Sequence, residues 1–143
     1  MNTALDSKIV KTFIVAGVLI SKDNKYLLVQ EKQSKAYGLW NWPGGKVEIG
    51  YSIEDTAIKE AKEECGYDVK LIEEVGVYHE HIKAPVQHLY KAEIVGGELS
   101  YPEDEIINAK WFSYQEILHM KDKLRGSWIL SAVEKLENIR NLT

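Results

Sequence analysis

The chain has little of what marks secreted, membrane-spanning or nucleic-acid-binding proteins. It holds a single cysteine, Cys65, among its 143 residues, which excludes an internal disulfide. Its longest apolar run, Phe13 to Ile20, is far too short to cross a bilayer. No leader with a charged start and an apolar core opens the sequence. We therefore expect a cytoplasmic protein that does not insert into a membrane.

Positive charge is outnumbered and nowhere concentrated. The chain holds 18 Lys and Arg against 22 Asp and Glu, so its net charge is -4. Without a basic run it is not expected to bind nucleic acid polymers; a small molecule is the expected partner, and a homodimer is left open. No repeat, low-complexity segment or linker divides the sequence, and 45% of its residues are hydrophobic. These features predict one domain over residues 1–143.

The most informative stretch is PGGKVEIGYSIEDTAIKEAKEECGY, residues 43–67. Glu60, Glu63 and Glu64 are spaced so that, at about 100° per residue, they share one stripe of a helix. Carboxylates this close repel one another, and a hard divalent cation with oxygen ligands would offset the repulsion. For three glutamates alone, a solvated acidic face is the alternative. The Gly-Gly turn before the helix favours the metal site, because glycine lets a backbone approach a ligand closely.

Local signals set the ends of this helix. Ser52 is an N-cap candidate with Asp55 three residues on, and Gly66 suits the position after the last turn. The helix is therefore expected from about Ile53 to Cys65. Its expected apolar face consists of Ala57, Ile58, Ala61 and Cys65. On that face, the cysteine is interpreted as a small core residue rather than a nucleophile.

The stretch resembles the box of the Nudix (MutT-like) hydrolase superfamily, written G-x5-E-x7-R-E-U-x-E-E-x-G-U, where U is apolar. Laid on this chain, the box starts at Gly45 and ends at Tyr67. The residues that match the family pattern are Gly45, Glu60, Ala61, Glu63, Glu64 and Gly66. The preceding GLWNWPGG, residues 38–45, also resembles the family's usual approach to the box.

The resemblance implies an α/β (α+β) fold, a Nudix-type α/β/α sandwich with a mixed central sheet and helices packed on both sides. It implies hydrolysis of a nucleoside diphosphate linked to another group, a pyrophosphohydrolase reaction, with Mg²⁺ or Mn²⁺ as the cofactor. The family's metal-binding positions fall on Glu60, Glu63, Glu64 and the carbonyl of Gly44. The general base is left open between Glu63 or Glu64 and a residue of a distant loop.

Two positions depart from the box, since Tyr51 stands in place of Glu and Lys59 in place of Arg. In the family these two side chains are described as interacting and orienting the helix. Losing one alone would strand a charge, whereas here both have changed, and a phenol oxygen can accept a hydrogen bond from an ammonium. We expect a compensated pair; the alternative is that both residues are independent and solvated.

A distant loop offers a further carboxylate. In the family, a loop between the last strands often adds one to the metal site, and Pro102 to Glu105 reads PEDE here. Glu105 is the preferred residue and Glu103 the next, with a plain surface loop as the alternative. The stretch LRGSWILSAVEKL, residues 124–136, is similar to a subgroup of Nudix proteins and suggests that Arg125 and Trp128 edge the cleft.

Four residues outside the box are candidates for substrate binding. Lys32, near the end of a strand, faces a phosphate or is merely solvated. Trp40 and Trp42 point the same way on an extended segment, and they either stack on a base or pack in the core. His79 lies on a strand end with His81 on the same face, where a polar contact with substrate is favoured over zinc.

Hydrophobic patterning predicts the remaining elements. Strands are expected at Phe13–Ile20, Tyr26–Glu31, about Val69–His79, about Val86–Val95 and Ala109–Phe112, with a short extended piece at Lys46–Glu48 and a loop at Gln33–Asn41. Ser113 with Glu116 predicts a capped short helix to about His119, and Trp128 to Asn141 has helical spacing.

Two functions of different classes follow from these features. The intact glutamates favour a metal-dependent hydrolase of diphosphate bonds. The weakened box favours a Nudix-fold module that binds or senses a nucleotide with little or no catalysis. A plain acidic scaffold would leave the Gly-Gly turn and the glutamate spacing unexplained.

Overall fold

The computed structural model describes residues 8–142. The expected absence of a leader concerns residues 1–7, which lie outside this range. Seven strands form one mixed sheet, with β3-β2-β1-β6-β5 as its main path. The strands are β1 (Ile14–Lys22), β2 (Lys25–Glu31), β3 (Trp40–Asn41), β4 (Gly44–Lys46), β5 (Tyr67–Tyr78), β6 (Val86–Gly97) and β7 (Ile106–Ser113). The helices are α2 (Ile53–Cys65), α3 (Tyr114–Leu118) and α4 (Ser127–Asn141), with short 3₁₀ turns η1 (Ser34–Ala36) and η2 (Lys121–Lys123).

The sheet divides along β1. Strands β1 and β2 form a hairpin, but they pair only near its tip, at Ser21↔Tyr26 and Lys22↔Lys25. Further along, β1 pairs with β4 instead, while β2 pairs with β3 and β7. On its other edge β1 runs parallel to β6, which pairs antiparallel with β5. The split between β1 and β2 leaves an opening at the end of the sheet away from the hairpin.

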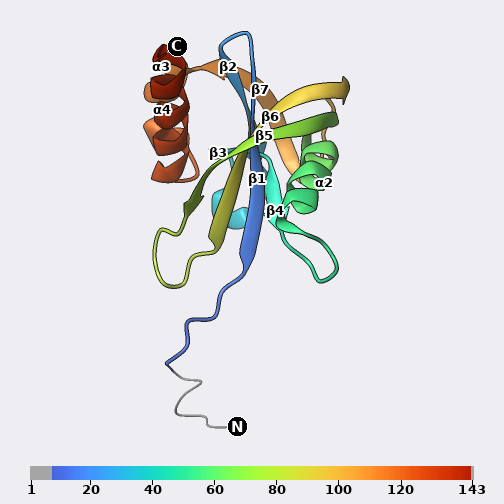
Figure 1. Cartoon of the computed structure of the whole chain (residues 1–143), viewed down its shortest axis with the longest axis vertical. Helices are drawn as coiled ribbons and strands as arrows, with labels where there is room; N and C mark the ends of the chain where they lie inside the picture. Colours follow the sequence, from blue (N-terminus) through green and yellow to red (C-terminus); the bar gives the residue numbers. More distant parts are fainter. Residues whose placement is uncertain (1–7, 143) are drawn as a thin grey trace.

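Helices cover both faces of the sheet, as predicted. Figure 1 shows α2 on one side and α3 with α4 on the other. The core on the α2 side includes Ala57, Ala61 and Cys65, which are fully buried against β1, β5 and β6 residues. The core on the α4 side includes Ile129, Val133 and Leu136. The small residues of α2 let this helix lie close to the strands and bring its glutamates to their edge.

The boundaries of α2 agree with the prediction. The Ser52 hydroxyl accepts a hydrogen bond from the Asp55 amide at 3.0 Å, and Gly66 has a φ of 82°. A Cβ at Gly66 would also lie 2.2 Å from the Glu98 carbonyl oxygen, so position 66 excludes side chains for two reasons. One assignment was wrong, because Ile58 is 38% exposed and buried Thr56 takes its place.

The other helices and strands agree with the sequence prediction, apart from small differences in where they begin and end. The capping box of Ser113 and Glu116 is present, and α3 ends at Leu118. Strand β5 stops at Tyr78, so His79 lies beyond it, and β6 continues through Gly97. The segment expected to be a loop at Gln33–Asn41 contains η1 and β3.

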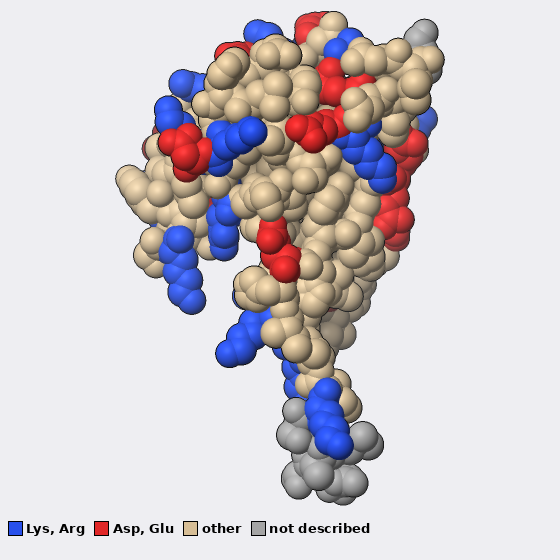
Figure 2. Space-filling view, turned by 90° about the vertical axis from the view of Figure 1, so that its left-hand side faces the viewer, with Lys and Arg blue, Asp and Glu red and all other residues tan. Residues whose placement is uncertain are grey.

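The charged side chains do not form one basic surface on the face that Figure 2 shows, where Lys and Arg alternate with Asp and Glu. Among the described helices, none is long and apolar enough to cross a membrane. Cys65 is fully buried, and burial raises the pKa of its thiol to about 12. The interpretation of Cys65 as a core residue is therefore confirmed.

Candidate active site

The opening between β1 and β2 is a cleft of about 740 Å³. Its floor comes from the strands and its rim from the β5–β6 loop, η1 and the residues before α4. The lining residues that matter for the chemistry below are Glu31, Asn41, Gly44, Gly45, Lys46, Glu80, His81, Lys83, Arg125, Ser127 and Trp128. The glycine turn of the box therefore lies directly in the cleft.

Two glutamates of α2 pack against this turn. The Gly44 amide donates a hydrogen bond to Glu64 Oε2 at 2.8 Å. A Cβ at Gly45 would lie 2.4 Å from the carboxyl carbon of Glu60, closer than side chains ever approach. Gly44 is also tightly placed, because its Cβ would come within 2.8 Å of the Ala16 carbonyl oxygen. The turn is thus shaped to hold two carboxylates against bare backbone.

The carboxylates around the glycine turn raise one another's pKa. Burial raises the pKa of Glu64 well above its ordinary value, and the nearby charges of Glu60, Glu31 and Glu105 raise it further, against the Gly44 amide. The pKa of Glu60 is raised by burial first and then by Glu63, with a further contribution from Glu105. Three elements therefore bring acidic groups close enough to repel, namely α2, β2 and the loop before β7.

This donor set suits a hard divalent cation. Carboxylate oxygens that repel one another and a turn without side chains are what such an ion requires. Among residues 8–142, no group of three His, Cys, Asp or Glu side chains already converges at ligand distances. Glu64 instead accepts the Gly44 amide, and Glu63 is half exposed and 3.7 Å from the Lys59 ammonium. The oxygen donors therefore lie near one another, and binding of a cation would bring them to ligand distances.

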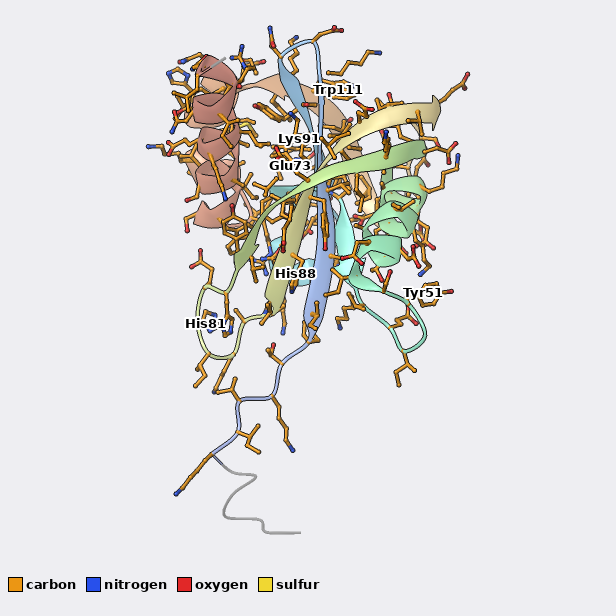
Figure 3. All side chains as sticks on the ribbon, viewed as in Figure 1. Tyr51, Glu73, His81, His88, Lys91 and Trp111 are labelled. Carbon is orange, nitrogen blue, oxygen red and sulfur yellow. The ribbon has the colours of Figure 1, made fainter. Side chains whose placement is uncertain are left out.

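The two departures from the box contact each other. The Lys59 ammonium lies 5.1 Å from the centre of the Tyr51 ring, over its face, rather than hydrogen-bonded to the phenol oxygen. It also lies 3.8 Å from a carboxylate oxygen of Glu48 and 3.7 Å from one of Glu63. Figure 3 shows Tyr51 pointing outward from the loop before α2. Glu48, which the sequence analysis did not single out, supplies a carboxylate near the position where the box has Glu.

We expect Tyr51 and Lys59 to be coupled in stability. The cation over the ring is lost equally in Tyr51→Leu, in Lys59→Gln and in the double variant. The loss of unfolding free energy in the double variant should therefore be smaller than the sum of the single losses, measured by urea denaturation. The pair Tyr51→Leu with Lys62→Gln is the control, since Lys62 binds Asp68 instead. Strict additivity for both pairs would show that the contact is not formed in solution.

Lys32 holds the acidic loop rather than lining the cleft. Its ammonium donates to the Glu103 carbonyl oxygen at 2.7 Å, and its amide donates to the Glu105 carbonyl oxygen at 3.1 Å. The substrate contact predicted for Lys32 does not fit this placement. Glu105 is exposed, and its charge acts on both Glu60 and Glu64, which supports the preference for it over Glu103.

Trp40 and Trp42 lie in the core on the α4 side. They are 7% and 2% exposed, so neither offers a ring face to a base. Trp40 meets Phe112 edge to face at 4.9 Å, and Trp42 packs beside Tyr78 at 5.8 Å between ring centres. Of the two alternatives, stacking on a base or packing in the core, the second is correct for both residues. Their side chains belong to the core cluster that also contains residues of α4.

The β5–β6 loop contributes His81 to the cleft, and not His79, which the sequence favoured. His79 is not among the residues that line the cleft, whereas Glu80 and His81 are. Figure 3 shows His81 on this loop, at the end of the molecule where the cleft opens. The Ser127 hydroxyl donates to Glu80 Oε1 at 2.6 Å and ties the loop to the start of α4. The expected pair of histidines on one strand face does not form, since the strand ends first.

Sequence reasoning missed Glu31. Burial raises the pKa of this carboxyl, against the Asn41 amide at 3.3 Å and the Arg125 guanidinium at 3.9 Å, both of which lower it. A charged residue that ends a buried strand beside Lys32 was a usable signal. Arg125 and Trp128 do line the cleft, as their stretch suggested.

The family model for the NUDIX domain matches residues 11–131. The chain therefore belongs to the Nudix family. The ADP-ribose pyrophosphatase of Methanocaldococcus jannaschii is 36% identical over 90 residues, which are 60% of this chain and 53% of that protein. The oxidized purine nucleoside triphosphate hydrolase of Mus musculus is 34% identical over 104 residues, 70% of this chain and 65% of that protein.

Solved structures agree with this assignment. A NUDIX hydrolase from Nitrosomonas europaea superposes with a TM-score of 0.78 at 26% identity and covers 90% of both chains. An ADP-ribose pyrophosphatase from Streptococcus suis has a TM-score of 0.70 at 25% identity and covers 89% of this chain and 92% of that one. Among curated relatives, the chain spans between 36% and 62% of the length of three that it matches.

Proposed function

We propose that this chain is a metal-dependent hydrolase of diphosphate bonds, with a nucleoside diphosphate linked to another group as substrate. The observation that carries the proposal is the packing of Glu60 and Glu64 against the bare Gly44–Gly45 turn, which itself lines the cleft. Relatives that are named for diphosphate and triphosphate hydrolysis support it. Since the net charge is -4, an anionic substrate needs a cation between it and these carboxylates.

Each acidic residue has a proposed role. Glu60, Glu63 and Glu64, with the Gly44 carbonyl, would hold Mg²⁺ or Mn²⁺. When bound, such a cation neutralises diphosphate oxygens and makes water more acidic. Glu63, Glu64 or Glu105 would then take the proton of the attacking water, as a general base within hydrogen-bond reach of it. We expect the base to be one of these three residues, the protein to be cytoplasmic and a homodimer to be possible.

The alternative function is a nucleotide-binding module without turnover. The observation that favours it is the replacement of the box Glu and Arg by Tyr51 and Lys59, which leaves α2 oriented by a cation over a ring. Lys59 still has carboxylate partners in Glu48 and Glu63, so the helix keeps an anchoring contact. We therefore favour the hydrolase.

Hydrolysis in ¹⁸O-labelled water tests the reaction. Nucleoside triphosphates, ADP-ribose, dinucleoside polyphosphates and nucleotide sugars are incubated with Mg²⁺, and products are examined by mass spectrometry. We expect the label in a phosphate-containing product, because the carboxylate site activates water for attack at phosphorus. Label found only in a released sugar or alcohol hydroxyl would refute attack at phosphorus. Tight binding of one compound without turnover would favour the alternative.

A further inference from the structure

Arg125 is held in the cleft by three separate contacts. Its amide donates to the Trp40 carbonyl oxygen at 2.8 Å, beside the bridge between Leu124 and Trp40. Its Nε lies 3.9 Å from a carboxylate oxygen of Glu31, and its guanidinium carbon lies 5.9 Å from the Trp128 ring centre. Its side chain is nevertheless 41% exposed. The backbone and the side chain are therefore both positioned before any ligand arrives.

Gly126 makes the contact between Arg125 and Trp128 possible. A Cβ at this position would lie 2.0 Å from the Trp128 ring, so only glycine lets the ring fold back against the backbone beside Arg125. The guanidinium carbon then lies over the Trp128 ring, 5.9 Å from its centre. With Nε toward Glu31, the terminal N–H groups are the donors best placed for a ligand.

The surroundings of Arg125 select an anion. Lys35, Lys46 and Lys83 line the same cleft, each from a different element. The cleft is lined by four basic side chains against two acidic ones, Glu31 and Glu80, so its wall is net basic in a chain of net charge -4. Of these four, Lys46 lies over the Phe13 ring, and Arg125 has the planar fork that matches phosphate oxygens.

We propose that Arg125 is a substrate-binding residue that donates to phosphate oxygens of the diphosphate, with Glu31 and Trp128 as its positioning residues. This inference rests on the proposed function, because it concerns the same cleft and the same class of substrate. In this proposal Arg125 binds the phosphates and not the base. The competing role for the same side chain would be stacking of the base on the guanidinium.

Methylenediphosphonate is a suitable probe, since it mimics a diphosphate, has a P–C–P bridge that resists hydrolysis and carries no base. Its binding to the full chain is measured by calorimetry with Mg²⁺ for wild type, Arg125→Gln and Arg125→Lys. We expect the dissociation constant to rise about 10- to 100-fold in Arg125→Gln, the size of a lost charged hydrogen bond. Arg125→Lys should fall between, because it keeps the charge and loses the fork. The control Lys123→Gln removes a charge from the neighbouring turn outside the cleft and should change nothing.

The outcomes separate this inference from the proposed function. Unchanged binding of methylenediphosphonate in Arg125→Gln, while nucleotides are hydrolysed by wild type, would overturn the inference and leave the hydrolase standing. Arg125-dependent binding without turnover of any nucleotide would support the inference and remove the hydrolase. Weaker binding of adenosine alone in Arg125→Gln, with methylenediphosphonate unaffected, would assign Arg125 to the base and overturn it. Equal losses in Arg125→Gln and Lys123→Gln would reduce the effect to net charge and also overturn it.

Discussion

Replacing Glu64 by Gln should lower turnover by at least ~10²-fold, the scale of losing a catalytic group. Glu64 Oε2 accepts the Gly44 amide at 2.8 Å and lies where Glu60, Glu31 and Glu105 add negative charge. An amide oxygen can still accept that hydrogen bond, so the turn and the helix should keep their places. What is lost is the negative charge that a cation needs at this point. Turnover of the best panel substrate is the measurement.

Glu73→Gln is the matched control for Glu64→Gln. Glu73 lies on β5, exposed and paired across the strands with Lys91, as Figure 3 shows. The substitution Glu73→Gln removes the same charge from a surface that does not line the cleft. Turnover should stay at the wild-type level. A Glu64→Gln variant as active as this control would mean that the carboxylate of Glu64 has no part in the reaction.

Gly45→Ala should reduce turnover by about 10²-fold while leaving the chain folded. Its Cβ would lie 2.4 Å from the Glu60 carboxyl carbon, so this carboxylate must move. Because the clash is with the end of a side chain, the cost in stability should stay near 1 kcal/mol, at the low end for overpacking. Misplacing a ligand by about 1 Å, however, costs on the order of 10²-fold in rate. The concentration of Mg²⁺ for half-maximal turnover should also rise.

Gly50→Ala provides the contrasting variant. Gly50 has a φ of 95°, and a Cβ there would meet nothing within 4 Å. Alanine should lower the unfolding free energy by about 1–2 kcal/mol through its backbone conformation and leave the Mg²⁺ requirement unchanged. If Gly45→Ala behaved in the same way as Gly50→Ala, the close packing of Glu60 on the turn would have no functional role.

The features that the sequence predicted well depend on near neighbours in the chain. The ends of α2 follow from a hydroxyl at Ser52 and from the positive φ that Gly66 allows, both of which act within one helical turn. The capping box at Ser113 is equally local. The glutamate stripe needs only helical geometry, so placing Glu60 and Glu64 on one side required no tertiary information.

The substrate residues depended on contacts between distant segments, and there the sequence was a poor guide. Trp40 is buried in part by Phe112 and Trp42 in part by Tyr78, residues of strands β7 and β5 that lie far along the chain. Lys32 meets Glu103 across 71 positions, and nothing near Lys32 signals this partner. Glu31 acquires its role only because β2 leaves β1 and opens the cleft beside it.

The two departures from the box, Tyr51 and Lys59, were predictable in part. A contact between Tyr51 and Lys59 was inferable from the family pattern, and the Lys59 ammonium does lie over the Tyr51 ring; that the two residues compensate each other stays a prediction. The form of the contact, a cation over a ring with Glu48 beside it, depends on the path of the loop between β4 and α2. The family pattern does not prescribe that path.

The central claim is that carboxylates of the box act on a diphosphate through a divalent cation. The most direct measurement is turnover of the panel compounds by the wild-type chain in excess EDTA and again after Mg²⁺ is restored. We predict no turnover in EDTA and full recovery with Mg²⁺, because the repelling carboxylates need a cation to hold an anionic substrate. Full turnover in excess EDTA would contradict the account.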